Sequence, residues 1–113
     1  MEEAGPIEEL HLESPGGERL LALINGDRGL LLYARHVGDP GFVSLNPEFS
    51  GWPDDLVAFR LNNGQVDSYP GEHVISAVLV REAIEYFKRT RRPPTFVTWL
   101  NDSGDGKEIT DAV

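Results

Sequence analysis

Two apolar runs on either side of a short turn constrain the fold of this chain more than any other feature. The runs are "RLLALIN" at residues 19–25 and "LLLYAR" at residues 30–35, and the turn between them spans Asn25 to Gly29. Neither run alternates between apolar and polar residues, so side chains on both faces of each strand must be buried. The pattern therefore predicts a hairpin of two central strands that is covered on both faces.

Shorter segments predict further strands around this hairpin. Residues 8–13 alternate as a strand that Ser14-Pro15-Gly16-Gly17 turns, and "GFVSLN" at residues 41–46 alternates in part. Residues 56–61 and 65–69 are expected to form a second hairpin, in which Asn63-Gly64 supplies the two positive φ angles of a tight turn. The first strand of this second hairpin carries two sets of side chains on opposite faces, namely Val57, Phe59 and Leu61 on one and Leu56, Ala58 and Arg60 on the other.

The pattern changes to that of a helix at Ser76. Apolar residues then recur at the spacing of one helix face and form a stripe of Val80, Ala83, Ile84 and Phe87. Ser76 is a suitable N-cap, and basic residues near the end of the segment suit the C-terminal end of the helix dipole. We therefore predict a helix over residues 76–90 that Pro93-Pro94 terminates.

"TFVTWL" at residues 95–100 alternates as a final strand, with Val97 and Trp99 on one face. Residues 101–113 are rich in Asp and Gly and are expected to fray. The length of 113 residues fits a single domain, residues 1–113. The predicted fold class is α+β, with an antiparallel sheet of about six or seven strands packed against one main helix in the C-terminal half.

Charge restricts the partners of such a domain. The chain has 19 acidic and 10 basic residues and a formal net charge of −9, so its surface repels nucleic acid and favours cationic partners. Basic residues nevertheless crowd into residues 81–92. No apolar run is long enough to span a membrane, and the acidic start lacks the basic region of a secretory signal. We expect a cytoplasmic protein that binds neither membrane nor nucleic acid.

Motifs for catalysis, cofactors and metals are missing or incomplete. The chain has no cysteine, and its three histidines, His11, His36 and His73, never form a close pair. "NDSGDGKEITDA" at residues 101–112 is similar to a calcium loop, but Ala112 stands where a bidentate Glu is needed. Asp54-Asp55 is better explained as a solvated turn than as a catalytic pair. We therefore predict a binding protein with no catalytic residue, cofactor or metal.

The run from Asn62 to Trp99 contains an ordered set of positions, namely Asn63, Gly64, Tyr69, Pro70, Ala83, Phe87, Arg92, Pro93, Val97 and Trp99. At these positions the run resembles an immunity-protein family of bacterial polymorphic toxin systems. "GDPGF" at residues 38–42 is similar to an upstream element of some members, so the resemblance covers roughly residues 38–100. The chain departs from the family at Thr90-Arg91-Arg92, where relatives usually have a glycine, and at Leu100, where a polar residue is common.

The resemblance implies that the chain neutralises a cognate toxin by stoichiometric binding, and that this toxin is a nucleic-acid deaminase, acting for example on cytosine. The matched residues are expected to stabilise the fold, with Trp99 packing on Phe87. We instead expect the toxin to contact the loop "NPEFSGWPDD" at residues 46–55 and the segment just before it. An acidic loop with large aromatic residues could cover the basic entrance of a deaminase, and the candidate residues are Asp39, Glu48, Phe49, Trp52, Asp54 and Asp55.

Some alternatives remain open from the sequence. Trp52 is either an anchor at the surface or a core residue that the loop delivers. The function is alternatively that of an acidic interaction or regulatory module of the same fold without a toxin partner. A third possibility is a small hydrolase that uses His36 or His73 with an acid.

Overall fold

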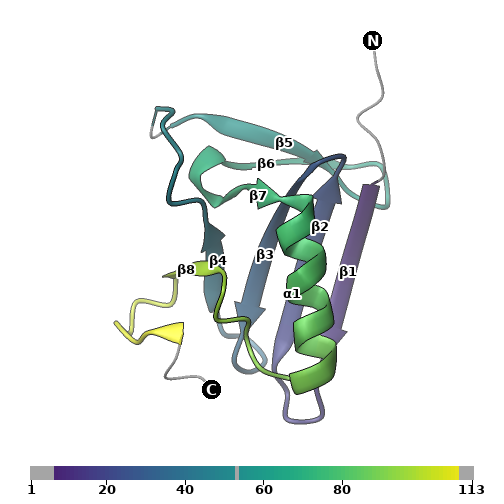
Figure 1. Ribbon diagram of the computed structural model, residues 1–113, viewed down its shortest axis with the longest axis vertical. Helices are drawn as coiled ribbons and strands as arrows, with labels where there is room; N and C mark the ends of the chain where they lie inside the picture. The colour runs from purple at the N-terminus through teal and green to yellow at the C-terminus, as the bar shows by residue number, and fades with distance from the viewer. Residues whose placement is uncertain (1–6, 53, 110–113) are drawn as a thin grey trace.

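A six-stranded antiparallel sheet carries one long helix on one of its faces (Figure 1). The computed structural model describes residues 7–52 and 54–109. The α+β class and the antiparallel sheet against one main helix are confirmed. The elements are β1 (Ile7–Glu13), β2 (Arg19–Asn25), β3 (Arg28–Ala34), β4 (Phe42–Leu45), β5 (Leu56–Arg60), β6 (Val66–Pro70), a 3₁₀ helix (Gly71–His73), β7 (Ile75–Ser76), α1 (Ala77–Thr90) and β8 (Thr98–Asn101).

The main sheet has the order β1-β2-β3-β4-β8, and β7 shares one edge of β3 with β4. β3 pairs with β4 near Leu32 and with β7 near Gly29. Between the two pairings, the hydroxyl of Ser44 accepts a hydrogen bond from the amide of Leu31 at 3.1 Å and donates one to the carbonyl of His73 at 2.8 Å. Ser44 is fully buried, so its side chain completes the hydrogen bonding where the two short strands separate.

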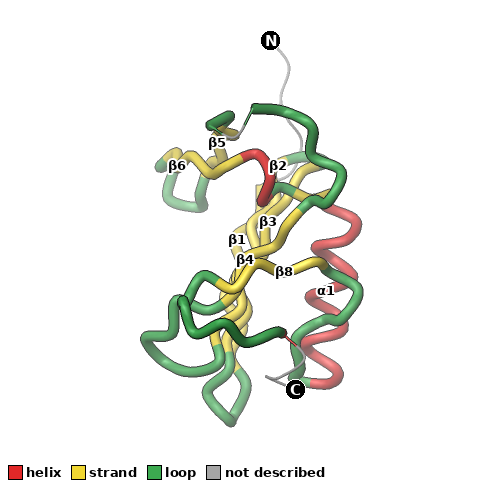
Figure 2. The backbone as a smooth tube through the Cα atoms, turned by 90° about the vertical axis from the view of Figure 1, so that its left-hand side faces the viewer, coloured by secondary structure: helices red, strands yellow, loops and turns green. Residues whose placement is uncertain are grey.

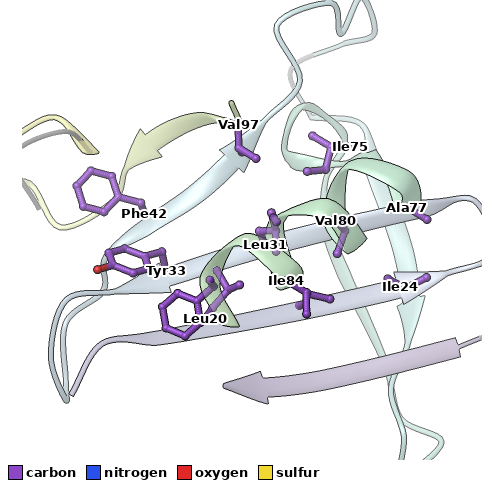
Figure 3. Close-up of a cluster of buried hydrophobic side chains, with 13 residues drawn as sticks. Leu20, Ile24, Leu31, Tyr33, Phe42, Ile75, Ala77, Val80, Ile84 and Val97 are labelled. Carbon is purple, nitrogen blue, oxygen red and sulfur yellow. The ribbon is translucent and has the colours of Figure 1, made fainter. Parts of the chain in front are cut away.

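The β2–β3 hairpin lies at the centre of the sheet and is covered on both faces, as its apolar runs predict. One face packs under α1, and Figure 3 shows this main core, which includes Leu20, Ile24, Leu31 and Tyr33. Leu23 and Leu30 point to the other face, where they form a second cluster with the fully buried Phe59. The two runs do not alternate because both strands contribute apolar side chains to a cluster on each face of the sheet.

Helix α1 follows the predicted pattern closely. Ser76 is the N-cap, and its hydroxyl accepts a hydrogen bond from the amide of Leu79 at 3.1 Å. The predicted stripe is buried against β2 and β3, and its members are Val80, Ala83, Ile84 and Phe87. At the other end Arg91 caps the helix in the left-handed conformation, with φ 59° and ψ 28°, and its amide bonds the carbonyl of Phe87.

The second hairpin is a separate two-stranded ribbon of β5 and β6 (Figure 2). The ribbon lies across the face of the sheet opposite α1, and Phe59 meets Tyr69 edge to face at 5.8 Å inside the second cluster. The tight turn predicted at Asn63-Gly64 is wrong, because Gly64 has a positive φ, at 90°, and Asn63 does not. The amide of Leu61 bonds the carbonyl of Gln65, so the connection is a three-residue loop and not the tighter two-residue turn.

The C-terminal segment differs from its predicted contacts in two respects. The last strand begins at Thr98, and the ring of Trp99 lies 6.3 Å from that of Tyr33, which in turn meets Phe87 at 6.4 Å. Tyr33 is therefore the aromatic neighbour that Trp99 and Phe87 share. Residues 102–109, where fraying is expected, are attached to the fold, since Asp105 pairs with Arg35 at 2.7 Å and Ile109 packs against the main core. Residues 110–113 lie outside the described residues.

Candidate functional site

The loop between β4 and β5 lies at one end of the molecule, next to the ribbon (Figure 1). Its first turn is held by Asn46, whose carboxamide oxygen accepts a hydrogen bond from the amide of Glu48 at 3.0 Å. The amide of Asn46 bonds the carbonyl of Glu72 at 2.7 Å, and the amide of Phe49 bonds the carbonyl of Asn46 at 3.1 Å. Backbone hydrogen bonds therefore fix the entry to the loop against the 3₁₀ helix.

Phe49 attaches the middle of the loop to the rest of the molecule. Its half-buried ring lies against two glycines, such that a Cβ atom would stand 2.8 Å from the ring at Gly71 and 2.7 Å at Gly51. A side chain at either glycine would have to displace the ring, and at Gly51 also the carboxylate of Asp55, whose Oδ2 would lie 2.5 Å from the Cβ. Phe49 thus helps to hold the loop.

Trp52 lies at the surface and not in the core, since it is 75% exposed and takes no part in either core cluster. Its backbone is nevertheless held firmly. The carboxylate of Asp55 accepts a hydrogen bond from the amide of Trp52 at 2.8 Å, and the amide of Asp55 bonds the carbonyl of Trp52 at 3.0 Å. A large aromatic side chain is therefore presented to solvent on a backbone that hydrogen bonds to Asp55 hold.

Glu48 and Asp54 supply negative charge on either side of Trp52 along the loop. Both residues are exposed, and neither carboxylate forms an ion pair or hydrogen bond within the described part of the chain. Asp55 is exposed as well, but its carboxylate is engaged with the loop backbone. The two free carboxylates are thus available to a cationic partner, whereas Asp55 shapes the loop.

Asp39 lies apart from the other candidates, because it precedes β4 whereas they follow it. Its side chain is only 2% exposed and accepts hydrogen bonds from Nε of Arg35 at 2.7 Å and Nη2 at 2.9 Å. Two backbone amides, of Arg35 and Gly41, bond the same carboxylate. The Arg35 guanidinium and these amides hold the pKa of Asp39 well below its ordinary value. The structure therefore gives Asp39 a role in fixing the β3–β4 connection.

The outward face of the ribbon adds apolar surface that the sequence did not assign to the site. Leu56 is 64% exposed and directly follows the loop, and Val66 is 52% exposed on the partner strand. The alternation in residues 56–61 does separate Leu56 and Ala58 from the buried face, but it does not say which face meets solvent. We call the combined region the loop–ribbon surface, formed by Glu48, Trp52, Asp54, Leu56, Ala58 and Val66.

A second exposed apolar region lies on the outer side of α1. A cleft of ≈ 520 Å³ is bordered by Val78, which is 66% exposed, and by Phe96, which is 46% exposed and meets Tyr86 edge to face at 5.6 Å. Charges of both signs surround it, namely Arg81, Glu82, Glu85 and Arg89. This mixed border offers less charge complementarity to a strongly basic partner than the loop–ribbon surface does.

The histidines are dispersed over the fold. His11 contacts Glu9 at 2.9 Å, His36 contacts the carbonyl of Val37, and His73 lies 3.8 Å from Glu72. Within residues 7–52 and 54–109, no group of three or more His, Asp or Glu side chains could hold a metal ion. No helix of the described chain is long and apolar enough to cross a membrane.

A family model described as Immunity protein Imm1 matches residues 1–101, which include the whole stretch from Asn63 to Trp99 that carries the resemblance. No curated protein matches the chain.

Proposed function

Because the chain belongs to the Imm1 family of immunity proteins, we propose that it neutralises its cognate toxin by binding that toxin through the loop–ribbon surface. We further propose that the toxin is a nucleic-acid deaminase, acting on cytosine, and that the complex forms in the cytoplasm. The chain needs no catalysis, cofactor or bound nucleic acid for this role. Stoichiometric coverage of the active-site entrance is sufficient.

The exposure of Trp52 is the observation that carries the proposal. A tryptophan that is 75% exposed can contribute a large contact area to a partner pocket, and tryptophan is among the residues enriched at binding hot spots. Asp55 and Asn46 already hold the loop by hydrogen bonds. Little conformational freedom is then lost on binding, which favours a tight complex.

Charge supports a partner with a basic cleft. A deaminase must admit a polyanionic strand and extrude a base into its pocket, so the entrance to its active site is expected to be positively charged. Glu48 and Asp54 are exposed and unpaired within the described chain, and the formal net charge is −9. These charges would accelerate encounter with the toxin and orient the loop toward its cleft.

Titration of the toxin's activity tests the proposal. The product of the neighbouring gene, which we expect to be the toxin, would be purified with and without the chain, and deamination of a cytosine-containing single-stranded DNA would be followed. We expect the two proteins to co-purify and the activity to fall linearly to zero at one chain per toxin. Tight binding without loss of activity would refute occlusion. A toxin without deaminase activity that the chain still neutralises would refute the substrate class alone.

A further inference from the structure

The ribbon leaves one strand edge open beside the loop. In the β5–β6 ladder the amide of Gly71 bonds the carbonyl of Asp55, and the amide of Leu61 bonds the carbonyl of Gln65. Bonded and non-bonded pairs alternate in an antiparallel ladder, so Val57 and Phe59 also bond β6. The N–H and C=O groups of Leu56, Ala58 and Arg60 must then point away from β6, toward the outer edge of β5.

Arg60 shows that this outer edge accepts a partner with the geometry of a strand. Its amide donates to Oδ1 of Asn25 at 2.7 Å, and its carbonyl accepts from Nδ2 of Asn25 at 3.1 Å. The side-chain amide of Asn25 thus occupies the place of a peptide group in a neighbouring strand. Leu56 and Ala58 have no such partner among the described residues, and both are exposed.

The outer edges of β6 and β1 carry features that discourage pairing. The outer edge of β6 ends at Pro70, which has no N–H group, and β1 carries three glutamates, Glu8, Glu9 and Glu13. β5 has neither proline nor charge between Leu56 and Phe59. Its open edge also adjoins the loop that carries Trp52.

We propose that the toxin adds an extended segment to β5, pairing with the backbone of Leu56 and Ala58. This inference rests on the proposed function and specifies its mode of contact. The outward side chains of β5 are apolar at the loop end, and Leu56 is 64% exposed. A matching segment therefore has apolar side chains on the same face and Lys or Arg at the end that meets Glu48 and Asp54. Main-chain hydrogen bonds hold such a segment, and the side chains select it.

Residue-resolved amide exchange tests this pairing directly. NMR would be recorded for the full chain, free and in complex with the same neighbouring gene product. We expect the amides of Leu56 and Ala58 to become at least about tenfold more protected on binding. Val57 and Phe59 already bond β6 and should change less, so protection would alternate along β5. Equal protection of all four amides would show that the toxin only covers the ribbon and would overturn strand pairing.

Proline at two paired positions gives an independent test. Ala58 and Ser68 lie opposite one another, and each directs its N–H group to an outer edge of the ribbon. Proline is tolerated at such edges because no ladder bond is lost. We expect Ala58→Pro to weaken toxin binding by at least about tenfold and Ser68→Pro to change it by less than about threefold, with both variants folded by circular dichroism.

The outcomes separate this inference from the function on which it rests. If the toxin is inhibited at one chain per toxin but both proline variants bind as the parent does, the function stands and strand pairing on β5 is refuted. If protection of Leu56 and Ala58 depends on the concentration of the free chain, the edge pairs with a second copy and the toxin segment is refuted. Failure of the toxin to bind at all would overturn both proposals.

Discussion

Arg91 adopts a backbone conformation that side chains disfavour. It is the one non-glycine residue with a positive φ in the described chain, at 59°. A left-handed conformation costs a residue with a Cβ about 1 kcal/mol, and glycine avoids this cost. We predict that Arg91→Gly stabilises the domain by about 0.5–1 kcal/mol, measured by denaturant unfolding.

Arg92→Gly is the matched control for Arg91→Gly. It removes the same charge one residue later, where φ is not positive, and should leave stability unchanged or slightly reduced. Equal effects of the two substitutions would mean that the lost positive charge, and not the backbone conformation, determines the result.

The Arg35–Asp39 pair couples stability to pH. Hydrogen bonds from Arg35 keep the pKa of Asp39 below its ordinary value of 3.8 in the folded state, so the unfolded state takes up the proton first as pH falls. The stabilisation is then complete above the unfolded pKa and is lost as pH falls toward the folded pKa. We predict that Asp39→Asn destabilises the domain by about 2 kcal/mol at pH 7, and by progressively less below about pH 4.

Urea titrations between pH 7 and pH 3 measure this difference. Asp54→Asn makes the same chemical change at an exposed position with no described partner, and should shift stability little at any pH. A pH-independent loss in Asp39→Asn would show that the carboxamide fails to fit the site for reasons other than charge.

At the scale of elements, truncating a side chain is expected to destabilise the domain on one side of α1 and not on the other. Phe87 is 3% exposed in the main core, and Phe87→Ala should destabilise the domain by about 3–5 kcal/mol through lost burial and a cavity. Val78 is 66% exposed on the outer side, and Val78→Ala should change stability by less than about 0.5 kcal/mol. Chemical denaturation of both variants measures the contrast. A loss below about 1 kcal/mol for Phe87→Ala would contradict the assigned core face.

Elements with a strong local period were predictable from the sequence. The stripe of α1 and its cap at Ser76 follow from spacing alone, and the two apolar runs correctly indicated a hairpin covered on both faces. The ribbon was less predictable, since local patterns specify its strands but not where the ribbon packs. Its turn was wrong because an Asn-Gly pair suits both a two-residue turn and the last position of a three-residue loop.

The candidate site was harder to predict than the fold. The exposure of Trp52 depends on how the whole loop folds, and Phe49 attaches this loop to Gly71, a residue distant in sequence. The ion pair of Asp39 with Arg35 at a spacing of four residues could have been suspected from the sequence. Its burial could not, because it depends on how the β3–β4 connection folds back.

For the whole molecule, we expect different residues of the proposed interface to determine the association rate and the dissociation rate of the toxin. Trp52→Ala should increase the toxin dissociation rate by an amount equivalent to about 2 kcal/mol while leaving the stability of the free chain nearly unchanged. Surface plasmon resonance measures the rate, and Phe96→Ala, an exposed aromatic on the α1 side, is the control. A larger effect of Phe96→Ala would move the interface to the outer face of α1.

Removal of charge from the loop should act on association instead. We predict that Glu48→Gln with Asp54→Asn slows association with the toxin and weakens its dependence on salt, because long-range attraction is reduced. Glu82→Gln with Glu85→Gln changes the net charge equally on α1. If both double variants slow association to the same extent, only net charge matters and the loop has no special role in steering.

The pairing of β4 with β8 at the edge of the main sheet has a consequence for the order of folding. β1, β2 and β3 meet through short turns, but nearly half of the chain lies between β4 and β8. Contacts between distant segments require a large loop to close before they contribute stability. The hairpins and α1 should therefore assemble first, and the β8 edge should join after the rate-limiting step. Loss of the Trp99 ring would then accelerate unfolding and leave the refolding rate nearly unchanged.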